Sequence, residues 1–114
     1  MTLELDHIQI AIPPDSEEVA RAFWSGKIGL SEIPKPLALR PRGGCWFQLG
    51  QHELHLGVEN PFTPSKKAHP GFLTSDLQGL AEKLDDVLWD TAIEGRARFF
   101  TTDPFGNRLE FIQA

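Results

Sequence analysis

The stretch Asp103–Ile112, DPFGNRLEFI, decides how the rest of the chain is interpreted. Its first half predicts a tight turn, because proline fixes its own φ angle and Gly106-Asn107 readily adopts left-handed backbone angles. Its second half alternates, so that Leu109 and Phe111 face one side of a strand and Glu110 faces the other. A buried charge is costly unless it is paired, hydrogen-bonded or bound to a metal. We therefore expect Glu110 to lie at the rim of a wet cavity or to act as a ligand.

The composition predicts one globular unit with many turns. The chain has 114 residues, 40% of them hydrophobic, with 10 glycines and 9 prolines. A net charge of −5 argues against nucleic acid or an anionic membrane as a partner. No apolar run approaches the ~18 residues of a membrane span, and the N-terminal residues lack a signal-peptide pattern. Because the single Cys45 cannot form an internal disulfide, we expect a cytoplasmic protein.

The first half of the chain predicts one helix among several strands. The helix is expected to begin at Asp15, which can form a capping box with Glu18. Prolines predict a loop over residues 31–43, with at most a short edge strand around residues 37–40. Strands are expected at residues 2–12, 44–50 and 52–58.

After an expected linker at residues 59–66, the second half repeats this plan. A helix capped by Ser75-Asp76 carries apolar residues at helical spacing as far as Leu88. Strands precede and follow this helix, at residues 68–73, 89–93 and 96–102 and in the terminal stretch quoted above.

Five polar residues lie on the expected strands, on the faces opposite the apolar side chains: His7, Glu53, His55, His69 and Glu110. Imidazole and carboxylate together are the usual ligands of Zn, Ni, Mn, Fe or Co. The same residues could also form the ordinary polar surface of sheets that are covered on one side only. Because Glu53 and His55 share a face, either could be the fourth ligand, with the other beside it or facing the substrate.

A further set of side chains could line the same concave face and contact a small ligand: Gln9, Trp46, Gln48, Arg98 and Phe100. Arg98 could hold an anionic group of a substrate or could be solvated. Arg108 shares the face of Glu110 and could pair with it or lie beyond the rim.

Several short segments carry a family resemblance: Asp6-His7-Ile8, Phe23-Trp24, Lys27-Ile28-Gly29-Leu30, Gly50–Leu56, Ala68–Phe72, Ser75-Asp76-Leu77 and Asp103–Phe111. With them the chain resembles the vicinal oxygen chelate superfamily, which comprises glyoxalases, fosfomycin-modifying thiol transferases, methylmalonyl-CoA epimerases, extradiol dioxygenases and bleomycin-binding proteins. The aspartate-proline-x-glycine-asparagine turn followed by glutamate is a specific marker when the earlier histidines accompany it.

The resemblance implies an α+β fold of two tandem βαβββ modules in a single domain, at about residues 1–58 and 67–114, joined by the linker at 59–66. The modules would form an open, curled mixed sheet that cups a metal, with helices on the outer face. His7, His69 and Glu110 match ligand positions of the family, and Glu53 matches the glutamate used by glyoxalases. Many small members pair as dimers, and exposed strand edges favour a homodimer here too.

The resemblance further implies a divalent-metal-dependent enzyme acting on a small oxygen-chelating substrate, by lyase, isomerase, thiol transferase or dioxygenase chemistry. The ion would act as a Lewis acid, and Glu53 or Glu110 would move the proton as the catalytic residue. The alternative is a non-catalytic, drug-sequestering protein of the bleomycin-resistance type, which Trp46 and Phe100 would favour. The fold alone does not choose among these activities.

Overall fold

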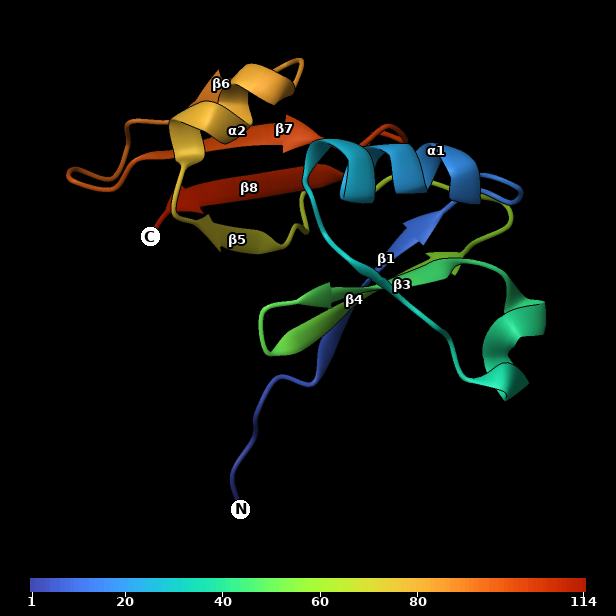
Figure 1. The fold of residues 1–114 in the computed structure, drawn as a ribbon. Coiled ribbons are helices and arrows are strands. Elements are labelled where there is room, and N and C mark those ends of the chain that lie inside the picture. The colour runs from blue at the N-terminus through green and yellow to red at the C-terminus, as the bar shows by residue number, and fades with distance from the viewer. The chain divides into compact units, whose positions relative to one another are not determined.

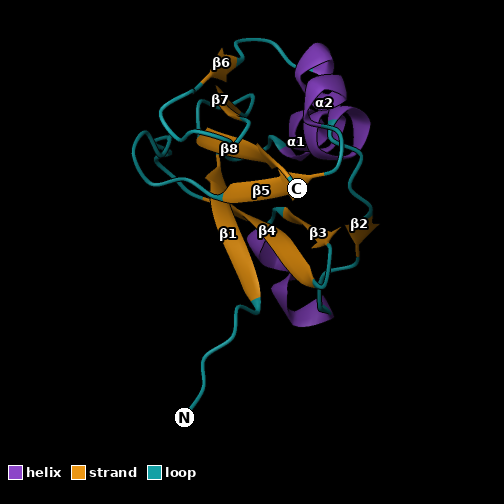
Figure 2. Cartoon of the chain, turned by 90° about the vertical axis from the view of Figure 1, so that its left-hand side faces the viewer, coloured by secondary structure: helices purple, strands orange, loops and turns teal.

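Two four-stranded sheets form the framework, one in each half of the chain (Figures 1 and 2). The computed structural model describes residues 1–114 and divides into two units, Met1–Thr63 and Pro64–Ala114. Each unit contains a strand, a helix and three further strands. The predicted α+β class with two tandem βαβββ modules is therefore confirmed, with each module forming its own open, mixed sheet.

The first unit arranges its strands in the order β1-β4-β3-β2. β1 is parallel to β4, whereas the other neighbours are antiparallel. Its elements are β1 (His7–Ile12), α1 (Glu17–Arg21), the π-helix η1 (Ala22–Lys27), β2 (Glu32–Ile33), the 3-10 helix η2 (Leu37–Arg42), β3 (Cys45–Leu49) and β4 (His52–Val58).

Alternate residues of these strands are buried, as the sequence pattern predicts. The buried apolar side chains of the sheet are Ile10, Ile12, Cys45, Phe47, Leu54 and Leu56. Burial of each large apolar side chain contributes about 1.5–3 kcal/mol to folding. The opposite face of the same strands is left to polar side chains, and it carries the candidate site.

The first helix differs from its prediction at its start. Ser16, rather than Asp15, precedes α1, and its hydroxyl donates to the carbonyl of Pro13 at 2.6 Å. After Arg21 the helix widens into η1, where the N–H of Ile28 reaches the carbonyl of Phe23 five residues earlier. This wider turn lets the neighbours Phe23 and Trp24 both be buried.

The second unit has the strand order β5-β8-β7-β6, with β5 parallel to β8. Its elements are β5 (Gly71–Thr74), α2 (Leu77–Lys83), β6 (Leu88–Trp89), β7 (Arg98–Thr102) and β8 (Arg108–Gln113). In Figure 1, α2 lies over β7 and β8. The buried apolar side chains of this sheet are Phe72, Phe99, Leu109 and Phe111. As predicted, Asp76 caps α2, because its carboxylate accepts the N–H of Gly79 at 3.0 Å.

Two further predictions were wrong in extent. α2 ends at Lys83 instead of continuing toward Leu88, which lies in β6 and is 69% exposed. The left-handed Asp86, at φ 52°, lies between the two elements and turns the chain there. The short edge strand expected near residues 37–40 is instead the 3-10 helix η2, and the edge strand is β2.

Neither α-helix has the length or apolar character needed to span a bilayer.

The predicted turn before β8 is present and is stabilised from within. The Asp103 carboxylate accepts the N–H groups of Phe105 and Asn107, both at 2.9 Å, and the side-chain amide of Asn107 at 2.8 Å. Gly106 has φ +94°, which a residue with a Cβ rarely adopts. Burial raises the pKa of Asp103, although these hydrogen bonds oppose the rise. The oxygen of the Asn107 amide accepts the N–H of Ser65 at 3.0 Å and so ties the preceding segment to the turn.

Candidate metal centre

The polar face of the first sheet gathers the predicted residues of this half. Residues that pair directly across strands point to the same side of a sheet. In the register, His7 pairs with Glu53, and Trp46 pairs with His55. The paired positions of this face are His7, Gln9, Trp46, Gln48, Glu53 and His55.

His55 lies between two other rings of this face. Its ring centroid lies 4.1 Å from that of His7 and 3.6 Å from that of Trp46, and the Trp46 ring is parallel to it within 3°. The Nε2 atom of His55 lies 2.9 Å from Oε1 of Glu53. A carboxylate that accepts one imidazole N–H fixes the orientation of the ring and leaves the other nitrogen for a ligand.

His7 has the same kind of partner. Its Nδ1 atom lies 2.9 Å from Oδ2 of the neighbouring Asp6, which makes Nε2 the ring nitrogen available to a ligand. The His7 side chain is 42% exposed, so a ligand has access to it.

The two glutamines of this face have local neighbours. The side-chain amide of Gln48 donates to the carbonyls of Gly50 and His52, at 2.7 and 3.0 Å, and so closes the turn between β3 and β4. The Gln9 side chain lies over Gly57, where a Cβ would meet its Nε2 atom at 2.8 Å. The role of both in substrate binding stays a prediction.

In the second unit, His69 and Glu110 meet. Nε2 of His69 lies 2.9 Å from Oε1 of Glu110, and Nδ1 of His69 lies 3.1 Å from the carbonyl oxygen of Lys67. The N–H of Glu110 donates to the carbonyl of Pro70 at 3.1 Å, which aligns the chain around His69 with β8. The local backbone pairing therefore brings together two residues that are 41 positions apart.

Arg98 contacts the other oxygen of Glu110. Its Nη1 atom donates to Oε2 of Glu110 at 3.0 Å, and its Nη2 atom forms an ion pair with Asp90 at 3.2 Å. Burial by itself would raise the pKa of Glu110, but hydrogen bonds and charges from His69 and Arg98 outweigh it and hold the pKa below its ordinary value. Glu110 is therefore ionised at neutral pH. Sequence reasoning missed Asp90, although it falls in the strand expected at residues 89–93, because the register that places it opposite Arg98 does not follow from the sequence pattern.

Phe100 lies beside this pair on β7. Its ring is edge-on to His69 at 5.3 Å between centroids, and the guanidinium of Arg108 lies 4.1 Å from the Phe100 ring centroid. Arg108 therefore contacts Phe100 rather than pairing with Glu110, and its position beyond the rim stays a prediction.

The strand registers define which positions of the two units correspond. In the first unit, Gln9 lies two residues after His7 and pairs with His55 on the central strand β4. His55 in turn pairs with Trp46 on β3.

In the second unit, Gly71 lies two residues after His69 and pairs with Glu110 on the central strand β8. Glu110 in turn pairs with Phe100 on β7. The two registers therefore match Glu110 with His55, whereas the sequence pattern had paired it with Glu53. They also match Phe100 with Trp46.

The donor chemistry of both units fits a divalent cation. A neutral imidazole has one N–H, yet both ring nitrogens of His69 face oxygen acceptors, Lys67 and Glu110. A cation held by Nε2 and the carboxylate would satisfy this arrangement. Neither unit by itself forms a group of three or more His, Cys, Asp or Glu side chains that could hold a metal.

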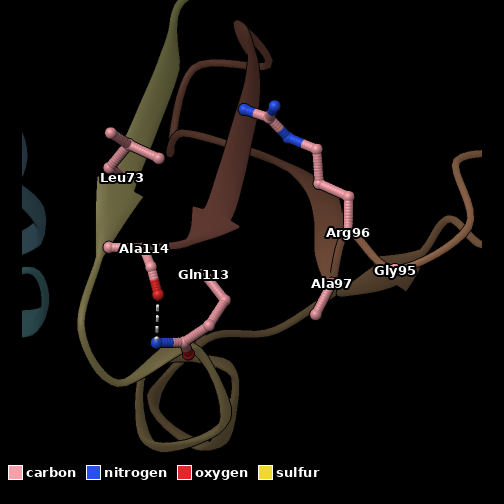
Figure 3. A pocket seen from close by; sticks show the side chains of 6 residues that line it. All are labelled: Leu73, Gly95, Arg96, Ala97, Gln113 and Ala114. Atoms are coloured by element: carbon pink, nitrogen blue, oxygen red, sulfur yellow. Dashed lines mark hydrogen bonds between the residues drawn. The ribbon is translucent and has the colours of Figure 1, made fainter.

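Two open cavities in the second unit lie apart from the predicted ligands. One, of about 700 Å³, lies at the C-terminal end of β8 and is lined by Leu73, Gly95, Arg96, Ala97, Gln113 and Ala114 (Figure 3). The other, of about 480 Å³, follows the loop between β6 and β7 and reaches Arg98. Because convergent polar groups define a site better than volume does, the imidazole and carboxylate groups remain the candidate centre.

Comparison with known proteins identifies the family through solved structures. No family model matches the chain, and no curated protein matches it. A crystal structure described as a glyoxalase family protein, from Bacillus anthracis, is 44% identical, with a TM-score of 0.94, covering 99% of this chain and 96% of that one. The chain therefore belongs to the glyoxalase/bleomycin resistance/dioxygenase superfamily.

More distant structures share the fold alone. Lactoylglutathione lyase from Agrobacterium tumefaciens is 20% identical with a TM-score of 0.68, covering 94% of this chain and 92% of that one. The fosfomycin resistance protein FosX from Listeria monocytogenes is 14% identical with a TM-score of 0.73, covering 100% of this chain and 93% of that one.

Proposed function

We propose that the chain is a divalent-metal-dependent enzyme that acts on a small substrate with two neighbouring oxygens. His7, His55, His69 and Glu110 would hold the metal. The observation that carries the proposal is the matched register, in which each unit places a histidine and a second donor at corresponding positions. The proposal requires the two pairs to meet at one ion, from one chain or from the two chains of a homodimer.

His55 is preferred over Glu53 as the fourth ligand. His55 occupies the position that corresponds to Glu110, and its Nε2 atom is within hydrogen-bond distance of Oε1 of Glu53, at 2.9 Å. Three imidazoles and one carboxylate suit Zn, Ni, Fe or Co better than Mn, because Mn prefers oxygen ligands.

Glu53 is the residue best placed to move a proton. Its side chain is 39% exposed and uses Oε1 to orient His55, whereas both oxygens of Glu110 are engaged. General-base assistance of this kind contributes roughly 10²–10⁴-fold in rate. A bound divalent metal would supply Lewis acidity toward the substrate oxygens.

The reaction would be of the lyase, isomerase, thiol transferase or dioxygenase type. Solved structures that share the fold are named for lactoylglutathione lyase and for fosfomycin resistance, so hemithioacetals and fosfomycin with thiols are the first substrates to screen, followed by catechols. The single buried cysteine agrees with a reducing compartment, and we place the protein in the cytoplasm.

Metal content tests this proposal. Protein purified without chelator and then incubated with Zn²⁺ or Co²⁺ should retain about one equivalent per chain, because all four donors serve one ion. His69→Ala should abolish this binding, and His55→Ala should weaken it more than Glu53→Ala does. Retention of less than about 0.2 equivalents by the wild type would refute the proposal, whereas equal losses in His55→Ala and Glu53→Ala would refute the ligand assignment.

A second candidate is a non-catalytic binding protein of the drug-sequestering kind. The observation that favours it is the matched placement of Trp46 and Phe100 on the polar faces of the two sheets. Metal-free protein should then bind a planar or cationic drug such as bleomycin, measured by quenching of tryptophan fluorescence, and His69→Ala should leave that affinity unchanged.

A further inference from the structure

Within the second unit, the Glu110 carboxylate is held from both sides. Oε1 lies 2.9 Å from Nε2 of His69, and Oε2 accepts a hydrogen bond from Nη1 of Arg98 at 3.0 Å. The side chains of Glu110 and Arg98 are only 13% and 11% exposed. The carboxylate is therefore restrained at both oxygens, with little solvent around it.

Arg98 is itself anchored. Its Nη2 atom pairs with Oδ1 of Asp90 at 3.2 Å, and the same oxygen accepts the N–H of Ala92 at 2.8 Å. The guanidinium also lies 5.3 Å from the ring centroid of Phe100. A planar guanidinium that joins two carboxylates in this way has a fixed position and direction.

One donor of this guanidinium is buried without a partner. Nε of Arg98 is buried and has no hydrogen-bond partner. An unsatisfied buried donor reduces stability, so the side chain is not placed optimally for folding alone. Each terminal nitrogen already faces a carboxylate, that of Glu110 or of Asp90, and these negative charges disfavour an anionic substrate group beside Arg98.

We propose that Arg98 is a positioning residue that fixes the orientation of the Glu110 carboxylate. By holding Oε2, it leaves Oε1 as the single oxygen presented beside His69 for a cation. The inference rests on the proposed metal function and adds that Glu110 binds through one oxygen, with Asp90 fixing Arg98 in turn. It is drawn entirely from contacts inside the second unit.

Three variants test the role of Arg98. Arg98→Met keeps the apolar stem and removes the hydrogen bonds, and Arg98→Lys keeps the charge but lacks the rigid planar fork whose two terminal nitrogens contact the two carboxylates. Arg108→Met is the matched control, because it removes the same charge from the same face of the sheet, two residues from Glu110 on β8, and its guanidinium lies over Phe100 rather than at the Glu110 carboxylate. Far-UV circular dichroism and thermal unfolding establish that each variant is folded.

Calorimetric titration with Co²⁺ alone gives the first result. Loss of a residue that orients a ligand typically weakens metal affinity by about 10–100-fold, and we expect this of Arg98→Met. Arg98→Lys should recover part of the loss, and Arg108→Met should bind like the wild type. The visible Co²⁺ absorption of Arg98→Met should also weaken relative to wild type, because a released Glu110 can bind through two oxygens and raise the coordination number.

The outcomes separate this inference from the proposed function. If the wild type binds Co²⁺ and Arg98→Met binds it equally well with the same spectrum, the positioning role is overturned and the metal function stands. If the wild type does not bind Co²⁺, the metal function is overturned, and ¹⁵N NMR of the metal-free proteins still tests the contact. Altered His69 ring-nitrogen signals in Arg98→Met would then support the orientation of Glu110, and unchanged signals would overturn it.

Discussion

Replacement of Asp103 tests how the turn before β8 is stabilised. Asp103→Ala removes an acceptor from three donors, namely the part-buried N–H group of Phe105 and the buried N–H group and side-chain amide of Asn107. A hydrogen bond to a charged group contributes about 1.5–3 kcal/mol, and an orphaned buried donor costs about 1–3 kcal/mol. Because desolvation of the carboxylate offsets part of this gain, we expect Asp103→Ala to lower the free energy of unfolding by about 3 kcal/mol.

Asp103→Asn separates the individual bonds. Oδ1 accepts both N–H groups and is retained in the new amide, but Oδ2 becomes an NH₂ group that faces the NH₂ group of Asn107. We expect a cost of about 1.5–2 kcal/mol, clearly less than for alanine. In the double variant Asp103→Asn with Asn107→Asp, the bond between the side chains re-forms in the opposite direction. The new carboxylate at 107 still accepts the N–H of Ser65.

Urea unfolding followed by circular dichroism measures these differences. The double variant should recover about half of the loss seen in Asp103→Asn, roughly 1 kcal/mol, with an unchanged dependence on urea concentration. The reasoning would be refuted if Asp103→Ala cost less than about 1 kcal/mol, or if the double variant were less stable than Asp103→Asn.

Three further predictions concern the first unit. The pKa of Glu17 lies below 4.5, mainly because its carboxylate accepts the Gly44 N–H at 2.8 Å. This hydrogen bond therefore stabilises the fold at pH values above the pKa that Glu17 has in the unfolded chain. The contribution is lost as the pH falls through the pKa of Glu17 in the folded chain. Thermal unfolding between pH 7 and pH 3 should accordingly show a shallower acid decline for Glu17→Gln than for wild type. Gly44→Ala should lower the free energy of unfolding by about 3 kcal/mol or prevent folding, because φ is +82° and a Cβ would clash with the Leu56 carbonyl. Gly50→Ala, where φ is +57° and the added Cβ meets open space, should lower it by only about 1 kcal/mol in the same urea assay. Burial raises the pKa of Cys45 to about 11, so iodoacetamide at pH 8 should label it only in urea, as mass spectrometry would show.

The sequence predicted the parts of the fold that depend on local alternation and turn chemistry. Alternating residues gave the correct faces of β4 and β8, and Asp76 caps its helix as expected. The widening of the first helix at Phe23 was not predictable, because π-helical turns depend on packing of the neighbouring side chains and have no strong residue preference. The early end of α2 was missed because Leu88 continues the apolar spacing, although it belongs to a strand.

The candidate site was predictable as a set but not in its pairings. The faces of Glu53 and His55 followed from their spacing, yet choosing between them needed the register of β4 against β1. Such a register is a long-range property that one strand does not encode. The contact of Asp90 with Arg98 depends on the register of β6 against β7, in which the Asp90 N–H donates to the Arg98 carbonyl at 3.2 Å, and this register does not follow from the sequence pattern of either strand.

The position that holds Arg98 in the second unit has a counterpart in the first. Arg98 lies two residues before Phe100, and Gly44 lies two residues before the matching Trp46. At Gly44 the backbone is left-handed and any Cβ would run into the carbonyl of Leu56. If the halves descend from one duplicated ancestor, only the second half has room for an arginine that holds the ligand on its central strand. Exchanging the halves in a redesigned protein would therefore also change which ligand an arginine holds.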